Sequence, residues 1–260
     1  MKLTYGSLFS GVGGFDLGFD RAGFECVWQV EKDKSCRTVL ERHWPNMRRY
    51  DDAREVPTGS LDDWRVDVIA GGFPCQGISA CNYRGLGLED ERSGLWHEFA
   101  RIIRILRPRY IVIENVPSLT FRGLDRVLFD LAESGYDAEW DTLSAQMFGA
   151  PHGRERLFIV AYAPGERREK DAFFNRSALE TAIEKSAARI RSWPGVREHS
   201  PALPDRIRWC PDSKLCRVAN EFPDELDRYR MLGNAVVPIV AEWIANRIQL
   251  TAAPAAKRKG

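Results

Sequence analysis

Short apolar segments alternate with amphipathic ones over the first two thirds of the chain, and this alternation limits the fold more than any other feature. Strand-like runs such as Leu3–Phe9 and Val66–Ala70 are separated by segments with helical periodicity such as Lys34–His43. The pattern predicts an α/β fold with a mostly parallel sheet and helices on both faces. Further strands are expected at Phe24–Val30, Tyr110–Glu114, Glu139–Leu143 and Leu157–Tyr162, and further helices at Gly14–Ala22, Gly94–Leu106 and Leu124–Ser134.

The alternation ends near Ala163, which divides the chain of 260 residues. Residues 163–215 are rich in charge, Pro and Trp, with one helix expected near Ser177–Arg191, and are predicted to form a small second lobe. Residues 216–250 are expected to return to the first domain and to end in an amphipathic helix, Ile239–Leu250. Residues 251–260 are expected to be a disordered basic tail.

Charge and cysteine content restrict the function classes only in part. The net charge of +1 neither supports nor excludes a nucleic-acid partner, because a balanced total can conceal a basic face. Locally basic stretches are interpreted as solvated faces, and one of them contains Arg101, Arg104, Arg107 and Arg109. The six cysteines include no CxxC pair, so no metal site is predicted. No segment has the length of a membrane span or the pattern of a signal peptide, so we expect a cytoplasmic protein with no membrane partner.

A glycine-rich turn, FSGVGGFD, follows the first expected strand. Gly11, Gly13 and Gly14 allow the backbone to approach a ligand, and the helix that begins there offers N–H groups to an anion. The dinucleotide fingerprint G-x-G-x-x-G fails because its last glycine falls at Asp16, and a P-loop fails because no Lys-Ser/Thr follows. The turn therefore suits a ligand that carries a carboxylate, and a tight turn without a ligand is the alternative.

Several polar or glycine-rich segments follow expected strands and are predicted to form one site. Glu31 ends the second strand, where an acidic side chain can accept hydrogen bonds from ribose hydroxyls. Asp52 precedes the third strand and is a candidate acceptor for an adenine amino group. Because the carboxyl ends of parallel strands meet at one edge of a sheet, residues 9–11, Glu31, Cys75 and Glu114 are expected to converge there.

Cys75 lies on a turn in GGFPCQGIS, whereas a structural cysteine usually packs within an apolar run. A nucleophilic thiol needs access, and it needs groups that manage charge on its target. The candidates for this role are Glu114 in IENVP and the pair Arg154 and Arg156 in GAPHGRERLFIV. An arginine that enters an apolar strand is costly unless it faces an anion or a strong acceptor. A purely structural ion pair between Arg156 and Glu114 is the alternative.

Taken together, these segments resemble the DNA cytosine-5 methyltransferases of the bacterial and phage type, with a short target-recognition region. FSGVGGFD resembles the S-adenosylmethionine turn, GGFPCQGIS the catalytic cysteine loop, ENV the glutamate motif and GAPHGRERLFIV the arginine motif. LCRVANEFPD resembles the segment after the recognition region, and RYRMLGNAVVP the closing cofactor motif. These six segments occur in the family's order, and the resemblance extends over nearly all of the chain outside the small lobe.

The resemblance implies a catalytic role for four residues. Cys75 would add as a thiolate to carbon 6 of a cytosine flipped out of duplex DNA, so that carbon 5 can attack the methyl donor. Glu114 would hold the N3/N4 edge of the base and stabilise protonated N3. Arg156 would bind O2, and Arg154 would support it or contact the nearby backbone.

The resemblance also implies the fold, the cofactor and its contacts. The fold would be the Rossmann-like S-adenosylmethionine-dependent methyltransferase fold, and the cofactor S-adenosyl-L-methionine. Phe9 would stack on the adenine ring, Glu31 would bind the ribose and Asp52 the adenine. The remaining expected contacts, made by the glycine turn and by a side chain that closes the site, are those of Gly11, Gly13, Gly14 and Asn234.

The expected domains and partners follow from the same resemblance. Residues 1–162 and 216–250 would form the catalytic and cofactor-binding domain, and residues 163–215 the target-recognition lobe. The residues Asn82–Gly94 resemble the family's loop that closes over flipped DNA. We expect a monomer that acts on double-stranded DNA, with a cognate restriction endonuclease, acting separately, as a candidate partner.

Departures from the family pattern leave other readings open. His152 replaces the usual glutamine, Lys32 replaces a tryptophan beside the cofactor, and the lobe is short for a domain that reads several base pairs. An RNA cytosine methyltransferase of the same fold is the main alternative. The tRNA-modifying relatives typically replace the Gly-Phe pair before Pro-Cys-Gln, so the intact Gly72-Phe73 pair favours DNA. A DNA-binding protein without turnover and a redox protein that uses Cys75 and Cys81 are less well supported, the latter because their spacing is wrong for a redox couple.

Overall fold

The computed structural model of the chain describes residues 2–74, 95–150, 152–166, 172–175, 177–181, 183–184 and 235–252. The strands are β1 (Thr4–Leu8), β2 (Glu25–Val30), β3 (Arg48–Tyr50), β4 (Val68–Gly71), β5 (Tyr110–Asn115), β6 (Asp137–Ser144) and β7 (Glu155–Tyr162). The main helices are α1 (Gly14–Arg21), α2 (Lys34–His43), α3 (Leu95–Leu106), α4 (Leu124–Glu133) and α7 (Pro238–Thr251). Short 3₁₀ helices include η1 (Ala53–Glu55), η2 (Leu61–Trp64), η4 (Pro117–Phe121) and η5 (Ala145–Phe148).

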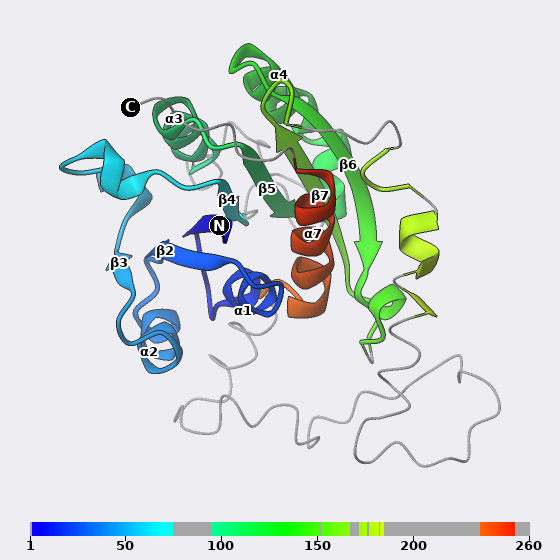
Figure 1. Ribbon diagram of the computed structural model, residues 1–260, viewed down its shortest axis with the longest axis horizontal. Helices are drawn as coiled ribbons and strands as arrows, with labels where there is room; N and C mark the ends of the chain where they lie inside the picture. The colour runs from blue at the N-terminus through cyan, green and yellow to red at the C-terminus, as the bar shows by residue number, and fades with distance from the viewer. Residues whose placement is uncertain are drawn as a thin grey trace.

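The strands form one sheet in the order β3-β2-β1-β4-β5-β7-β6 (Figure 1). The first five strands in this order pair in parallel, and β7 is antiparallel to both of its neighbours. The expected α/β fold with a mostly parallel sheet is therefore confirmed. The strand order reverses between β1 and β4, and the carboxyl ends at such a reversal are where open α/β sheets bind ligands.

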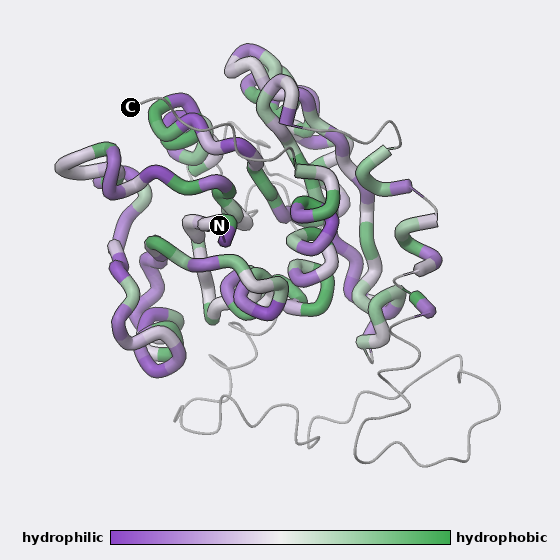
Figure 2. The backbone as a smooth tube through the Cα atoms, in the orientation of Figure 1, coloured by the Kyte–Doolittle hydropathy of each residue, from purple (hydrophilic) through white to green (hydrophobic). Residues whose placement is uncertain are grey.

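The central strands are buried on both faces, which explains why their sequences are almost continuously apolar. Ile69 of β4 and Ile111 of β5 pack into a core with α3 and α4. Their neighbours Val68 and Val112 point to the other face, into a core with α1 and α7. Figure 2 shows the hydrophobic residues along β4 and β5 in the middle of the molecule. Because successive side chains of a strand point to opposite faces, the sheet has one hydrophobic core on each side.

Helix α7 returns from the far end of the chain and packs beside α1 (Figure 1). Its side chains Ala241, Ile244 and Ile248 are fully buried in the core shared with α1. Gly14, at the start of α1, allows this approach, because a Cβ atom there would lie 2.2 Å from the carbonyl oxygen of Val236. Helices α1 and α7, from opposite ends of the chain, therefore form one helical layer on this face of the sheet.

Some local features differ from the sequence expectations. Strand β3 was not predicted, because the three residues Arg48–Tyr50 are too few to show alternation. The expected first strand ends at Leu8, and Phe9 instead has a left-handed backbone, with φ of 53°. Residues 177–181 and 183–184 are helical, as part of the helix expected near Ser177–Arg191, and residues 185–191 lie outside the described part of the chain.

The described residues contain neither a membrane-spanning helix nor a candidate metal site. No helix in them is long and apolar enough to cross a membrane. They also contain no group of three or more His, Cys, Asp or Glu side chains arranged to hold a metal ion. Of the six cysteines, Cys26 and Cys36 fall within the described residues, and neither is in a disulfide bond.

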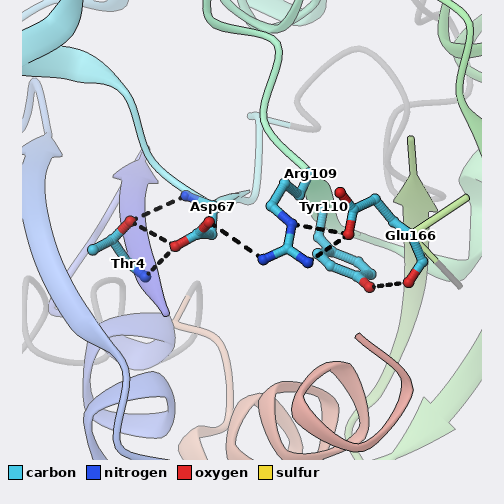
Figure 3. Close-up of polar contacts among 5 residues, drawn as sticks. All are labelled: Thr4, Asp67, Arg109, Tyr110 and Glu166. Atoms are coloured by element: carbon cyan, nitrogen blue, oxygen red, sulfur yellow. Dashed lines mark hydrogen bonds and ion pairs between the residues drawn. The ribbon is translucent and has the colours of Figure 1, made fainter. Parts of the chain in front are cut away.

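The basic stretch over residues 101–109 is held by polar partners within the fold. Arg109 is buried and pairs with Glu166, at 2.9 Å from its Nε, and with Asp67, at 3.6 Å from its Nη1 (Figure 3). The hydroxyl of Tyr110 donates to the carbonyl oxygen of Glu166 at 2.7 Å, and Asp67 accepts from the N–H of Thr4 at 2.9 Å. The other three arginines contact carboxylates or carbonyl oxygens of neighbouring elements, namely Arg101, Arg104 and Arg107. These charges are therefore used mainly within the domain.

A carboxyl group is enclosed between β1, α1 and β2. Asp16 has no exposed surface, and it accepts hydrogen bonds from Ser7 Oγ at 3.0 Å and from Gln29 Nε2 at 2.8 Å. Arg49 of β3 donates to the amide oxygen of Gln29 and so fixes its orientation. Burial raises the pKa of Asp16 to about 6, against the opposing effect of these two hydrogen bonds. The ionised carboxylate therefore destabilises the fold at neutral pH.

We predict that Asp16→Asn stabilises the protein at high pH. A pKa raised from 3.8 to about 6 corresponds to about 3 kcal/mol of lost stability above that range. The native state binds the Asp16 proton more tightly than the unfolded state, so stability falls as the pH rises between the two pKa values. The loss is absent below about pH 4 and complete above about pH 6. An asparagine can accept from Gln29 Nε2 through its oxygen and donate to Ser7 Oγ through its nitrogen, so both contacts remain, with the second one reversed. We therefore expect a gain of about 2 kcal/mol at pH 8 and little change at pH 4. Denaturant unfolding of both proteins at the two pH values measures this, and equal effects at both would contradict it.

Candidate active site

The register between β5 and β7 brings Glu114 and Arg156 together. Glu114 lies opposite Phe158 across this antiparallel pair, and Arg156 is two residues before Phe158 on the same strand. Alternate residues of a strand share a face, so both side chains point to the same side of the sheet. The Arg156 Nε lies 2.9 Å from Glu114 Oε1. Two residues that are 42 positions apart in the sequence therefore form a close ion pair at the carboxyl end of β5.

Glu114 is the more deeply buried member of this pair, with 7% of its surface exposed. Burial raises the pKa of its carboxyl, and the positive charges of Arg156 and then Arg154 oppose that shift. Within the described part of the chain, no N–H is aligned for a hydrogen bond with Oε1, although the Arg156 Nε lies 2.9 Å from it. The site therefore holds a carboxyl whose pKa is raised by burial and whose Oε1 has hydrogen-bonding capacity for a ligand.

Two contacts connect this carboxyl to the turn that leads to Cys75. A Cβ atom on Gly72 would lie 2.7 Å from Glu114 Oε2, so only glycine fits there without displacing the carboxylate. Asn115, the residue after Glu114, is buried and donates from its Nδ2 to the carbonyl oxygen of Phe73 at 3.1 Å. Cys75 itself lies outside the described residues, which end at Pro74 before this gap. The backbone two residues before the cysteine is thus anchored beside Glu114.

The glycine turn after β1 is organised by Glu31 at the end of β2. One oxygen of the Glu31 carboxylate accepts from the N–H of Gly11 at 2.7 Å, and the other accepts from the N–H of Asp33 at 2.7 Å. Burial raises the pKa of Glu31, and these two N–H groups act in the opposite direction. The N–H of Gly13 donates to the carbonyl oxygen of Ser10 at 2.9 Å. Among the described residues, a Cβ atom added to Gly11 would meet nothing within 4 Å.

Phe9 directly precedes this turn, and its backbone conformation is unusual for a residue other than glycine. Its φ of 53° places it in the left-handed region, which costs free energy for residues other than glycine. Its ring packs against that of Phe99 on α3, with the centroids 6.1 Å apart. The ring is only partly buried. The backbone therefore holds a partly exposed aromatic face beside Gly11.

Asp52 directly precedes the 3₁₀ helix η1 and caps it, on the sheet edge next to Glu31. Its carboxylate accepts from the N–H of Arg54 at 3.0 Å and from Lys32 Nζ at 3.1 Å. Burial acts to raise the pKa of Asp52, but these two donors outweigh it and the pKa is lowered. Lys32 is mostly exposed, so it leaves this contact at little cost. The carboxylate is an ionised acceptor near the surface.

The predicted site residues fall into two groups in the structure. The catalytic group contains Glu114 and Arg156, with Arg154 close enough to affect the pKa of Glu114. The cofactor group comprises Phe9, Gly11, Gly13, Gly14, Glu31 and Asp52, on the ends of β1 and β2 and the turn before η1. Asn234, like Cys75, lies outside the described residues. Sequence reasoning missed Asn115, although its place beside Glu114 in ENV was visible.

Comparison with known proteins decides the family. The sequence profile described as C-5 cytosine-specific DNA methylase matches residues 3–202, which is most of the chain. The chain belongs to this family. It is 40% identical over 169 residues to the type II methyltransferase M.Bsp6I of Bacillus sp. (strain RFL6), an alignment that covers 62% of this chain and 52% of that protein. It is 32% identical over 243 residues to the type II methyltransferase M.AquIA of Picosynechococcus sp., covering 86% of this chain and 97% of that one.

The coverage and the solved structures define how far this likeness extends. The chain spans about half the length of several curated relatives of the family, including M.Bsp6I and M.NgoBV of Neisseria gonorrhoeae. Among solved structures, the DNMT2 of Spodoptera frugiperda superimposes with a TM-score of 0.62 at 16% identity, covering 95% of this chain and all of that one. At that identity the superposition shows a shared fold.

Proposed function

We propose that the chain is a DNA (cytosine-5-)-methyltransferase that transfers a methyl group from S-adenosyl-L-methionine to carbon 5 of cytosine. One observation supports this most strongly, namely the Glu114–Arg156 pair at 2.9 Å, which lies against Gly72 and the turn that leads to Cys75. A carboxyl with a raised pKa and a guanidinium, side by side, match the N3/N4 edge and the O2 atom of cytosine. Membership of the family makes the same assignment.

The residues around the glycine turn fit S-adenosylmethionine. None of the described residues approaches the Cβ position of Gly11, Phe9 offers a partly buried ring for the adenine, and Glu31 can accept from ribose hydroxyls. Asp52 is an ionised acceptor suited to the adenine amino group. The amides of Gly11 and Gly13 have partners already, so Gly14 at the start of α1 is the best placed of the three to face the methionine carboxylate. When bound, the cofactor supplies an electrophilic methyl group on sulfur.

The proposed reaction begins when the Cys75 thiolate forms a bond with carbon 6 of a cytosine turned out of the DNA stack. Glu114 donates a proton or hydrogen bond at N3 and accepts from the N4 amino group, which stabilises the charge that develops in the ring. Arg156 donates to O2, and Arg154 adds positive charge beside the same carboxyl. Carbon 5 then takes the methyl group, which leaves the demethylated thioether of the cofactor, and Glu114 takes back any proton given to N3 when the adduct breaks down. A base, water-borne in our proposal, removes the carbon 5 proton, and the sulfur–carbon 6 bond breaks to release the thiolate.

The remaining parts of the proposal concern partners. Residues 163–215 would contact the target sequence, and double-stranded DNA would be the substrate of a monomer. The type II methyltransferase names of the relatives support a restriction-modification setting, with a separate endonuclease. A cytoplasmic location agrees with this setting.

The test is methyl transfer from tritiated S-adenosylmethionine to duplex DNA and, in parallel, to tRNA. We expect incorporation into DNA at least about a hundredfold above that into tRNA, because the Gly72-Phe73 pair is intact. Bisulfite sequencing of plasmid DNA from cells that express the chain should show cytosine methylation at one short sequence. Comparable counts on tRNA would favour the RNA alternative, and no counts on either would exclude both.

A further inference from the structure

We infer that Arg101 on α3 is a positioning residue for the cofactor pocket, because it holds the turn that presents Asp52 to the adenine amino group. This inference rests on the proposed function, since Asp52 has that role only in an S-adenosylmethionine site. Arg101 lies outside every motif that the sequence resemblance assigned to the cofactor. Only the folded arrangement brings it to the pocket.

The guanidinium of Arg101 spans the turn that follows Asp52. Its Nη2 donates to the carbonyl oxygen of Ala53 at 2.9 Å and to that of Val56 at 2.6 Å. Its Nε donates to Glu98 one turn earlier on α3, at 2.7 Å, which fixes the side chain. Ala53 begins η1 and Val56 follows its last residue, so one cation joins the start and the end of the turn. Charge-assisted hydrogen bonds of this kind fix the peptide planes as well as the position of the segment.

The orientation of the Asp52 carboxylate depends on that same turn. Asp52 caps η1, with Oδ1 accepting from the N–H of Arg54 at 3.0 Å and its carbonyl accepting from the N–H of Glu55 at 3.2 Å. Oδ2 points instead to the exposed Lys32 at 3.1 Å. One oxygen is therefore committed to the turn, and the other is the one that an amino group can reach. If the turn shifts, both oxygens shift with it.

Apolar packing alone does not set this geometry. The side chains of Ala53 and Val56 are buried in the α3 core and anchor the turn, but apolar contacts are not directional and do not orient the carbonyl groups that Arg101 binds. Arg104, three residues after Arg101 on the same helix, points away to Asp130 and Glu133 at 3.7 and 3.6 Å. It is similarly exposed and similarly paired, so it provides a matched control.

The experiment compares binding of S-adenosylhomocysteine and S-inosylhomocysteine, in which a carbonyl replaces the 6-amino group, by calorimetry on the full chain. We expect the wild type to prefer the adenine form, because Asp52 accepts from the amino group and repels the carbonyl. Arg101→Met should weaken S-adenosylhomocysteine binding about tenfold and reduce that preference at least about fivefold. Arg101→Lys, which keeps one donor, should fall between the two. Arg104→Met should match the wild type within about twofold.

The outcomes separate this inference from the proposed function. A wild type that binds neither compound overturns the proposed function, and the inference falls with it. A wild type that prefers adenine, together with an Arg101→Met variant that retains the full preference, overturns the inference alone. If Arg101→Met does not fold, the test is the preference of Arg101→Lys for S-adenosylhomocysteine over S-inosylhomocysteine. A preference equal to that of the wild type contradicts the inference. An equal loss in Arg104→Met would show a general effect of α3 and would also contradict it.

Discussion

Replacing Cys75 with serine is expected to reduce methyl transfer to DNA by at least about 10³-fold. A serine hydroxyl is a far weaker nucleophile at neutral pH than a thiol, a fraction of which is ionised. The cofactor residues are on other elements, so binding of S-adenosylhomocysteine should stay within about twofold of the wild type. Single-turnover methylation and calorimetry on the same preparations measure the two quantities.

The matched control for this variant is Cys81→Ser. Cys81 is the cysteine nearest to Cys75 in the sequence, and a redox mechanism would require both. We expect the control to retain activity within about threefold of the wild type. Normal turnover by Cys75→Ser would exclude the proposed nucleophile, and equal losses in both variants would favour a role for the pair.

Replacing Glu114 with glutamine is expected to reduce the rate of methyl transfer by about 10³-fold, because glutamine cannot supply a proton at N3. Stability should move the other way. Burial raises the pKa of Glu114 even in the presence of Arg156, which means that its ionised form is a net cost to the native state. The variant should therefore unfold at pH 8 at the same temperature as the wild type or a higher one. Single-turnover kinetics and thermal unfolding test the two statements.

A suitable control is Glu133→Gln, which makes the same chemical change on α4. Glu133 is exposed and lies 3.6 Å from Arg104, away from the site. Its substitution should change neither rate nor stability appreciably, since exposed pairs contribute little. A Glu114→Gln enzyme with more than a third of the wild-type rate would contradict the assigned role. A large loss of stability would instead support the structural ion pair as the main role of Glu114.

Much of the fold could be predicted from the sequence because the sheet is buried on both faces. Continuous apolar runs such as those in β4 and β5 are a strong signal, and the helix Lys34–His43 has the bounds that were expected. Strand β3 escaped prediction because its pairing with β2, rather than its composition, defines it. The approach of α7 to α1 through Gly14 is a tertiary contact that no local pattern indicates.

The candidate site was predictable as a list of residues but not as an arrangement. Strand ends and polar residues in apolar surroundings pointed to Glu31, Glu114 and Arg156. The closeness of Glu114 to Arg156 depends on the β5–β7 register, which no sequence pattern specified. Asn115 and Arg101 donate to main-chain carbonyl oxygens of Phe73 and Ala53. The acceptor of such a hydrogen bond cannot be predicted from residue type or spacing, because every residue has a main-chain carbonyl.

The central claim is that Cys75 attacks a cytosine held by Glu114 and Arg156, and a covalent trap tests it most directly. Duplex DNA with 5-fluorocytosine at the methylated position is incubated with the wild type and S-adenosylmethionine, and the products are separated under denaturing conditions. Because fluorine cannot leave as a proton does, the account predicts a stable protein–DNA adduct whose digested peptide carries the modification on Cys75. A substrate that is methylated when it carries cytosine, yet gives no adduct at Cys75 with 5-fluorocytosine, would contradict it.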